Sequence, residues 1–360
     1  MATYTIQGHR ISGREEGPSQ GQLALLIHGW SSSWFALSPL IAQVARRYQC
    51  LAVDLPGYGN SPPLPEPATI PRYADLLADL IRQVSDRPAA LVGHSMGGMI
   101  AITLALRHPE LVERMVLIAP TISGVLSTFI TVAIWPVTLL ESFRLGARLS
   151  RAVESQFVSL TDALMRPASF AERSGISAAD YARLRADARR PGQGRVRAEC
   201  YRAMAHNDLR GRLAQVEAPA LVIWGAEDNT VPLRDAGVVA DEWPAADLRI
   251  IPRAGHWPQF ETPDATRRHV ASFLGLPTAD ARTEATIGKT VEAVGEVAQF
   301  LASSDIGNGL NPTQRARLAA HFNQRYYAPG RLIAQAGEPG RHLFVVQEGS
   351  VEVLPAAAPD

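Results

Sequence analysis

The stretch Ala-Ala-Leu-Val-Gly-His-Ser-Met-Gly-Gly at residues 89–98 constrains the fold more than any other part of the chain. Its small and apolar beginning predicts a buried strand, and the apolar spacing over residues 99–105 predicts a helix. Ser95 lies between them in a Gly-x-Ser-x-Gly pattern. A serine at such a corner is held in a strained turn with its hydroxyl exposed. Gly93 and Gly97 fit this interpretation, because a side chain there would strike a neighbouring element.

The same corner favours a particular chemistry. A helix that begins after Ser95 presents N–H groups without partners and the positive end of its dipole. A negative oxygen that develops during acyl transfer is stabilised at such a place. The alternative is a glycine-rich turn without chemistry. The five-residue pattern alone is common, but inside a strand–turn–helix unit it is specific.

Short apolar runs recur along the chain and alternate with helical patterns. They lie at residues 23–27, 50–53, 89–92, 115–119 and 220–224, and a further run, interrupted by Arg249, lies at 248–251. Continuous apolar runs are typical of strands that are buried on both faces of a parallel sheet. Their alternation with helices predicts an α/β fold, a mostly parallel sheet with helices on both faces.

The chain has 360 residues, more than one ordinary domain needs. We expect an α/β core from residues 1–120 and 214–276, because the strand–helix rhythm stops and later resumes. Residues 121–213 predict an inserted helical cap. Residues 277–311 predict a linker and a helix, and residues 312–360 a small, incomplete β-roll.

Composition narrows the class of protein. Hydrophobic residues make up 46% of the chain, charged residues 19%, and the formal net charge is zero, which gives no reason to expect a nucleic-acid partner. Cys50 and Cys200 form neither a disulfide framework nor a zinc-binding spacing. With a polar N-terminus that lacks an apolar signal core, this favours a cytoplasmic protein. No motif indicates a metal or another cofactor.

Residues 115–140 carry no charged side chain and are long enough to span a bilayer. However, the first five read as a core strand, and Pro136 and several Ser and Thr residues interrupt the remainder. We therefore interpret the later part as an apolar helix over a lipid-like pocket, without an integral membrane span. Lipid contact through the cap is the alternative.

A serine hydroxyl needs a base, and the base needs a carboxylate that fixes its tautomer. Asp228 and His256 both follow predicted strands, and the carboxyl ends of strands form the ligand-binding edge of an open α/β sheet. The chain order Ser95, Asp228, His256 is the order expected when the serine lies in a strand–turn–helix unit of this kind. Glu227 is the alternative acid, although its spacing after Gly225 fits less well than that of Asp228.

Over residues 1–276 the sequence resembles the α/β-hydrolase fold family. The matching pieces are residues 28–30, 54–59, 93–98, 225–228 and 255–256. The resemblance implies that Ser95 is the nucleophile, His256 the general base and then acid, and Asp228 its orienting partner. It also implies an oxyanion hole formed by the backbone N–H groups of Trp30 and Met96.

The nucleophile limits the reaction. Dehalogenases and epoxide hydrolases of this family attack with aspartate, so Ser95 argues against both. Ester, thioester or lactone hydrolysis, acyl transfer and carbon–carbon bond hydrolysis remain. The Gly-His-Ser-Met-Gly-Gly motif resembles the monoacylglycerol-lipase-like and carboxylesterase branches, which favours a serine esterase acting on a small-molecule carboxylic ester. A carbon–carbon hydrolase of diketone-type substrates and a catalytically silent binding scaffold are the alternatives.

The cap is expected to select the substrate. Phe129, Ile134 and Trp135 offer an apolar lining for an acyl chain, and Trp257 directly follows the expected base. Each buried methylene contributes about 0.8 kcal/mol, enough to select a medium or long chain. The alternative is that the cap residues only pack the cap onto the sheet.

The C-terminal region has a different pattern. Residues 277–290 predict a linker, and residues 291–303 and 312–322 predict helices. The glycine-punctuated short strands that follow resemble the first part of a cyclic-nucleotide-binding domain. The departure is that the chain ends at Asp360, before that family's phosphate-binding cassette. Open strand edges favour pairing with another chain, so this segment is interpreted as a truncated product or as an element for self-association.

We predict that the chain does not bind cyclic nucleotides, because no residue of the C-terminal segment matches the phosphate-binding cassette. Isothermal titration calorimetry with cyclic AMP and cyclic GMP checks this. Saturable binding of either nucleotide would contradict the prediction.

Overall fold

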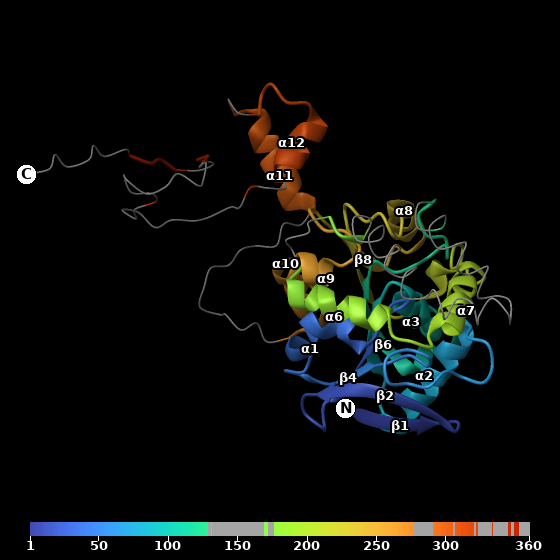
Figure 1. Ribbon diagram of the computed structural model, residues 1–360. Helices are drawn as coiled ribbons and strands as arrows, with labels where there is room; N and C mark the ends of the chain where they lie inside the picture. Colours follow the sequence, from blue (N-terminus) through green and yellow to red (C-terminus); the bar gives the residue numbers. More distant parts are fainter. Residues whose placement is uncertain are drawn as a thin grey trace, which may run out of the picture. The chain divides into compact units, whose positions relative to one another are not determined.

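The computed structural model of the chain describes residues 1–128, 131, 169–171, 176–276, 291–304 and 307–319, with a few isolated positions after them. The chain divides into two compact units, Met1–Thr278 and Ala279–Asp360. Figure 1 gives the order of the elements along the chain. The first unit carries all the residues that the sequence assigns to the site.

The described part of the first unit is built on one eight-stranded sheet in the order β1-β2-β4-β3-β5-β6-β7-β8. Its strands are β1 Ala2–Ile6, β2 His9–Glu16, β3 Gln22–Ile27, β4 Tyr48–Val53, β5 Ala89–His94, β6 Val112–Ile118, β7 Ala220–Gly225 and β8 Ala246–Ile251. The β1–β2 and β2–β4 pairs are antiparallel, and the other pairs are parallel. The predicted mostly parallel sheet is confirmed.

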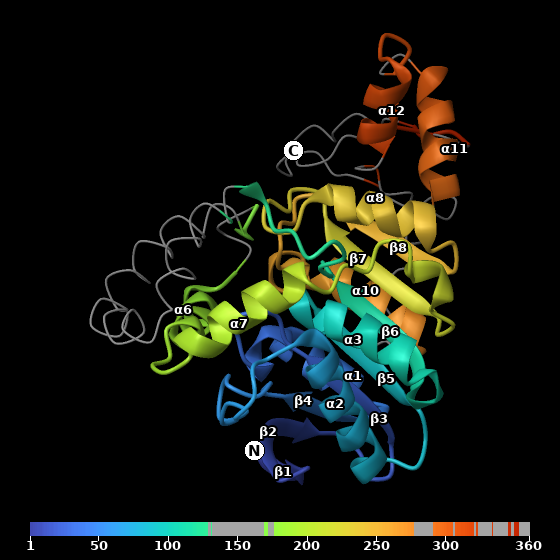
Figure 2. The same cartoon turned by 90° about the vertical axis from the view of Figure 1, so that its right-hand side faces the viewer.

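Helices cover both faces of this sheet, as predicted. On one face lie α2 Ile70–Val84, α3 Met96–Arg107 and α8 Leu233–Glu242 (Figure 2). On the other face lie α1 Ser38–Val44 and α10 Pro263–Leu274. Side chains along β3 alternate between the two hydrophobic clusters, with Leu25 in the first and Leu26 in the second. Both faces of the sheet are therefore buried against helices, which explains why the strand sequences are continuous apolar runs.

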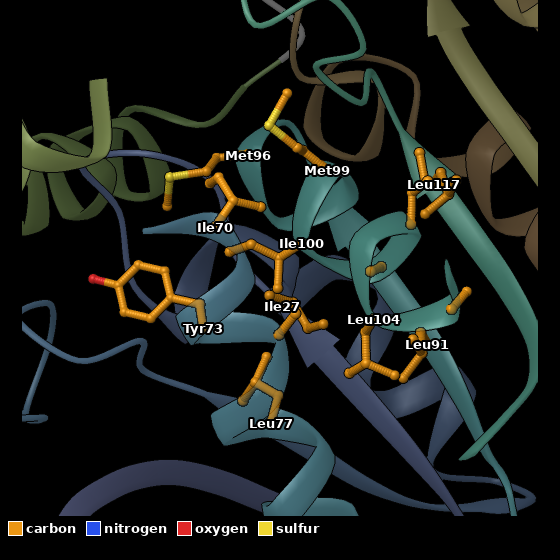
Figure 3. Packing of buried hydrophobic residues seen from close by; sticks show 14 of the residues in the cluster. Ile27, Ile70, Tyr73, Leu77, Leu91, Met96, Met99, Ile100, Leu104 and Leu117 are labelled. Carbon is orange, nitrogen blue, oxygen red and sulfur yellow. The ribbon is translucent and has the colours of Figure 1, made fainter. Parts of the chain in front are cut away.

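Helix α3 is buried on all sides along most of its length. Figure 3 shows Ile100 and Leu104 of α3 among Ile27 of β3, Leu91 of β5 and Leu77 of α2. A helix that is apolar all round is stable only when neighbours cover every face. The start of α3 is consequently fixed between the sheet and α2.

Two glycines allow α3 to approach the sheet closely. A Cβ on Gly97 would lie 2.1 Å from the Ile27 carbonyl oxygen, and one on Gly93 would lie 2.6 Å from the Gly97 carbonyl oxygen. Backbone therefore contacts backbone where β5 passes into α3. The predicted reason for both glycines, a lack of space for any side chain, is confirmed.

The segment after β3 contains two short helices. Three consecutive serines, Ser31–Ser33, predict the capped start of one helix that runs to about Arg47, but the structure has the 3-10 helix η1 Trp34–Leu37 followed by α1. Ser33 caps η1 by accepting from the Phe35 N–H. Pro39 has no N–H to donate to the Phe35 carbonyl, so a regular α-helix cannot continue through it.

Within residues 121–213, which the sequence predicts to be helical, the structure describes α6 Ala178–Ala188 and α7 Gly194–Ala205. The helical patterns at residues 126–140 and 145–159 fall almost entirely outside the described residues. The linker 277–290 also lies outside them, as do most residues of the expected β-roll. In the second unit, α11 Val291–Ala302 and α12 Pro312–Ala319 agree with the predicted helices. No helix within the described ranges is long and apolar enough to cross a membrane.

We predict that Gly97→Ala lowers the free energy of unfolding by about 3 kcal/mol or more, because overpacking against fixed backbone leaves no room for the methyl group. Urea unfolding checks this. Gly237→Ala, in α8 with open space around its Cα, is the matched control and is expected to raise the same free energy by about 0.5–1 kcal/mol. Equal stability of the two variants would contradict the prediction.

Candidate active site

Ser95 occupies the turn between β5 and α3 with strained backbone dihedral angles, φ 55° and ψ −119°. A non-glycine residue with positive φ persists only where its surroundings fix it. Here the Ser95 N–H donates to the Ile118 carbonyl at 2.9 Å, and its carbonyl accepts from Gly98 at 2.9 Å and Thr121 at 3.2 Å. The Ser95 side chain makes no capping bond to α3. The turn therefore holds the hydroxyl group in position without using it structurally.

Asp228 and His256 are in direct contact. Asp228 follows β7 and His256 follows β8, and His256 Nδ1 lies 2.8 Å from Asp228 Oδ2. An ionised carboxylate only accepts, so Nδ1 carries the proton and the Nε2 lone pair stays available. Asp228 Oδ1 accepts from the N–H groups of Thr230 at 2.8 Å and Val231 at 2.9 Å, which compensates for burial of the carboxylate. Glu227 is exposed, and Asp228 is the acid that contacts the histidine.

Ser95 and His256 line one small cavity of about 70 Å³ at the carboxyl edge of the sheet. The other lining residues come from the end of β5, from α7 and from the segments that follow β3, β6, β7 and β8. They are Gly29, Trp30, His94, Leu126, Ser169, Met204, Thr230 and Trp257. The cavity is mainly apolar with a few hydroxyl and imidazole groups, the usual character of a small-molecule site.

The other predicted site residues have different outcomes. Trp30 and Trp257 line the cavity with Ser95. The Met96 side chain is buried in the core beside Ile70 (Figure 3), so only its backbone N–H is available to a ligand. The predicted acyl-contact residues Phe129, Ile134 and Trp135 lie outside the described residues.

The loop that carries Trp30 is tied to both described helices of the 121–213 region. Trp30 Nε1 donates to the Arg197 carbonyl of α7 at 2.8 Å. Ser33 Oγ donates to Asp187 Oδ2 of α6 at 2.5 Å. These two bonds fix the loop after β3 against the helices that cover it.

Two buried histidines, His28 and His94, make hydrogen bonds to the main chain around the site. The Leu55 N–H donates to His28 Nε2 at 3.0 Å, so Nδ1 is the protonated nitrogen and donates to the Gly29 carbonyl at 2.7 Å. His94 Nε2 donates to the His256 carbonyl at 2.9 Å. Burial lowers the pKa of both side chains, that of His94 well below 6.5, and the nearby His256 lowers the latter further. Both are therefore neutral hydrogen-bonding groups.

Sequence reasoning missed three polar groups around the site. Ser169 and Thr230 line the cavity with their hydroxyl oxygens 3.1 Å apart, and Glu261 accepts hydrogen bonds from the loop that carries His256. Ser169 and Thr230 belong to no motif. The one signal that points to Glu261 is that it is an acidic residue directly after the uncharged run 257–260.

Among the described residues, no group of three His, Cys, Asp or Glu side chains is arranged to hold a metal ion. The two cysteines, Cys50 and Cys200, are buried and free.

Residues 24–269 match the model of the alpha/beta hydrolase family. The chain belongs to this family. The match covers more than half of the chain and spans Ser95, Asp228 and His256. The chain is accordingly a hydrolase by family.

This α/β hydrolase has relatives with different substrates. It is 29% identical to a pimeloyl-[acyl-carrier protein] methyl ester esterase of Chromobacterium violaceum, over 66% of this chain and 89% of that protein. It is 30% identical to a 2-hydroxy-6-oxononadienedioate/2-hydroxy-6-oxononatrienedioate hydrolase of Burkholderia vietnamiensis, over 63% of this chain and 76% of that protein. Its fold is similar to that of an enol-lactonase from Burkholderia xenovorans, with a TM-score of 0.64 and 22% identity. The match covers 76% of this chain and 100% of that one.

We predict that the hydrolase loses stability as the pH falls below 6.5. The pKa of His28 and of His94 is lowered in the folded state, so the unfolded chain binds protons there that the folded chain does not. Each group then lowers the free energy of unfolding by about 1.4 kcal/mol per pH unit below 6.5, until its folded pKa is reached. Urea unfolding between about pH 7.5 and 5.5 measures the slope.

Two variants separate this effect from other titrating groups. His94→Gln keeps an N–H donor but does not titrate, so the slope should become shallower. His206→Gln, at an exposed position, should leave the slope unchanged. An unchanged slope in His94→Gln would refute the assignment to this histidine.

Proposed function

We propose that this hydrolase cleaves carboxylic esters with an apolar acyl group through an acyl-enzyme intermediate on Ser95. The observation that carries the proposal is the Asp228–His256 contact of 2.8 Å beside a cavity that His256 shares with Ser95. A strained serine, an imidazole with a free nitrogen and a buried carboxylate are the three groups that acyl transfer needs.

In the first half of the reaction, His256 Nε2 removes the proton from Ser95 Oγ as this oxygen attacks the ester carbonyl carbon. The negative oxygen of the tetrahedral intermediate accepts from the N–H groups of Met96 and Trp30, and removing one such donor typically costs about 3–4 kcal/mol. The Asp228 carboxylate stabilises the imidazolium. His256 then gives its proton to the alkoxide, and the alcohol leaves.

In the second half, a water molecule takes the place of the alcohol. His256 Nε2 removes a proton from it as the water oxygen attacks the acyl-enzyme carbonyl carbon. Collapse of the second tetrahedral intermediate breaks the bond to Ser95 Oγ, which regains its proton from His256. The carboxylic acid is released and the free enzyme is restored.

The apolar acyl preference is supported by the lining of the described cavity, to which Trp30, Leu126 and Met204 contribute apolar surface. We propose that residues 121–213 form the cap that completes this surface and that Phe129, Ile134 and Trp135 contact the acyl chain. The esterase relative from Chromobacterium supports ester substrates.

Carbon–carbon bond hydrolysis of a diketone-type substrate is the second candidate. The relative from Burkholderia vietnamiensis, whose name describes a hydrolase of a 2-hydroxy-6-oxo dioic acid, favours it. The same Ser95, Asp228 and His256 would serve, with a carbanion rather than an alkoxide as the leaving group.

The cellular setting is part of the proposal. Free, buried cysteines support a reducing, cytoplasmic compartment. Lipid contact through residues 121–213 and self-association through residues 312–360 remain proposals, and most of the segments that would make these contacts lie outside the described residues.

We predict that Ser95→Ala folds like the wild type but hydrolyses p-nitrophenyl esters at least roughly 10⁴-fold more slowly, because the three groups act as a unit. The assay covers acyl chains of increasing length, and Ser19→Ala, at an exposed position far from the site in sequence, is the control. The chain-length optimum reports the depth of the acyl site.

Two results would change the proposal. Undiminished ester turnover by purified Ser95→Ala would refute the serine mechanism. Turnover of a diketone-type substrate without turnover of any ester would replace the esterase with the carbon–carbon hydrolase.

A further inference from the structure

Glu261 is a buried carboxylate that the proposed reaction does not use. It ends the short helix α9 Pro258–Glu261, five residues after His256, and only 8% of its surface is exposed. Its Oε1 accepts from the Gly255 N–H at 3.0 Å and from the Trp257 N–H at 3.1 Å. One carboxylate oxygen therefore binds the two peptide groups on either side of His256.

The second oxygen of Glu261 binds a distant segment. Its Oε2 accepts from the Ala171 N–H at 2.7 Å, and the His256 N–H donates to the Ser169 carbonyl at 2.8 Å. The two segments are in tight contact, since a Cβ on Gly255 would lie 2.8 Å from the Ser169 carbonyl oxygen and 2.9 Å from the Ala171 nitrogen. Glu261 thus links the loop that carries His256 to the segment 169–171, whose first residue, Ser169, lines the cavity.

The His256 peptide has no other regular support, because it lies outside every helix and strand. Its carbonyl accepts from His94 Nε2 at 2.9 Å, and its three consecutive N–H groups, from Gly255 to Trp257, bind Ser169 and Glu261. Buried main-chain groups need such partners. Two of these four bonds depend on Glu261 alone.

We propose that Glu261 is a positioning residue that holds the His256 ring between Asp228 and Ser95 and couples this ring to segment 169–171. The inference rests on the proposed function. A displacement of the base by about 1 Å reduces catalysis on the order of 100-fold. Glu261 touches no substrate atom and acts only through the main chain of the loop.

The test compares Glu261→Gln with Asp264→Asn, which makes the same chemical change three residues later at an exposed position. Glutamine offers one carbonyl oxygen and an NH₂ group that repels the peptide N–H groups it faces. Turnover of a p-nitrophenyl ester is normalised to the number of sites titrated by a serine-directed fluorophosphonate. A purely structural role reduces the number of titrated sites but leaves the turnover of each site unchanged.

We predict that Glu261→Gln lowers kcat per titrated site by roughly 10- to 100-fold while KM changes less than about twofold, and that Asp264→Asn matches the wild type. Wild-type kcat per site in Glu261→Gln, with a lower melting temperature, would assign the residue a structural role and overturn the proposal.

A second variant covers the case in which Glu261→Gln does not fold. Glu261→Asp keeps both oxygens but is one methylene shorter, so kcat per site should fall to an intermediate value. Wild-type turnover in this variant would also overturn the proposal.

Hydrogen–deuterium exchange separates this inference from the proposed function. The amides of residues 255–257 should exchange slowly in the wild type and faster in Glu261→Asp. If the fluorophosphonate does not label Ser95 in the wild type, the proposed function fails. The exchange result then decides on its own whether Glu261 holds the loop. Equal exchange in the wild type and in Glu261→Asp would contradict the proposed positioning role.

Discussion

The close backbone approach between helix α3 and strands β3 and β5 is the constraint on which the rest of the structure depends. Gly93 and Gly97 permit it, because no Cβ fits between them and the carbonyl oxygens that they face. With α3 pressed against the sheet, the chain must turn sharply between β5 and α3. The strained backbone of Ser95 is the result, and its hydrogen bond to the Ile118 carbonyl fixes the turn to the neighbouring strand β6. A serine hydroxyl is thereby held at a sheet edge where the other site loops also end.

The site around this serine is held together mainly by hydrogen bonds to the main chain. Asp228 accepts from two peptide groups as well as from His256, and Glu261 accepts from three. The neutral imidazoles of His28 and His94 also make hydrogen bonds to main-chain groups of the surrounding loops. Main-chain partners position a loop without adding charges that compete with the reacting groups. This is consistent with a preorganised site, in which little rearrangement accompanies the reaction.

The sequence predicted the parts of this arrangement that depend on local patterns. Continuous apolar runs predicted β3, β5 and β7, and the serine corner predicted the turn at Ser95. The contact between Asp228 and His256 followed from the edge at which parallel strands end. Glu261 could not be found in this way, because one of its partners, Ala171, is 90 residues away and takes part through its N–H, which every residue but proline has. The contribution of Met204 to the cavity likewise depends on how α7 packs, which no periodicity encodes.

The bonds from Trp30 to the Arg197 carbonyl and from Ser33 to Asp187 have a consequence for protein engineering. One partner of each bond lies in the loop after β3 and the other in α6 or α7. The loop and the two helices therefore belong together when segments are swapped between proteins. A chimaera that takes only the helices from a relative would leave the Ser33 hydroxyl without its acceptor unless the new α6 carries an acid at the position of Asp187. The Trp30 indole would keep a main-chain acceptor only if the new α7 packed in the same place. Transfer of substrate preference between members of the family would therefore require the loop and the helices to be transplanted together.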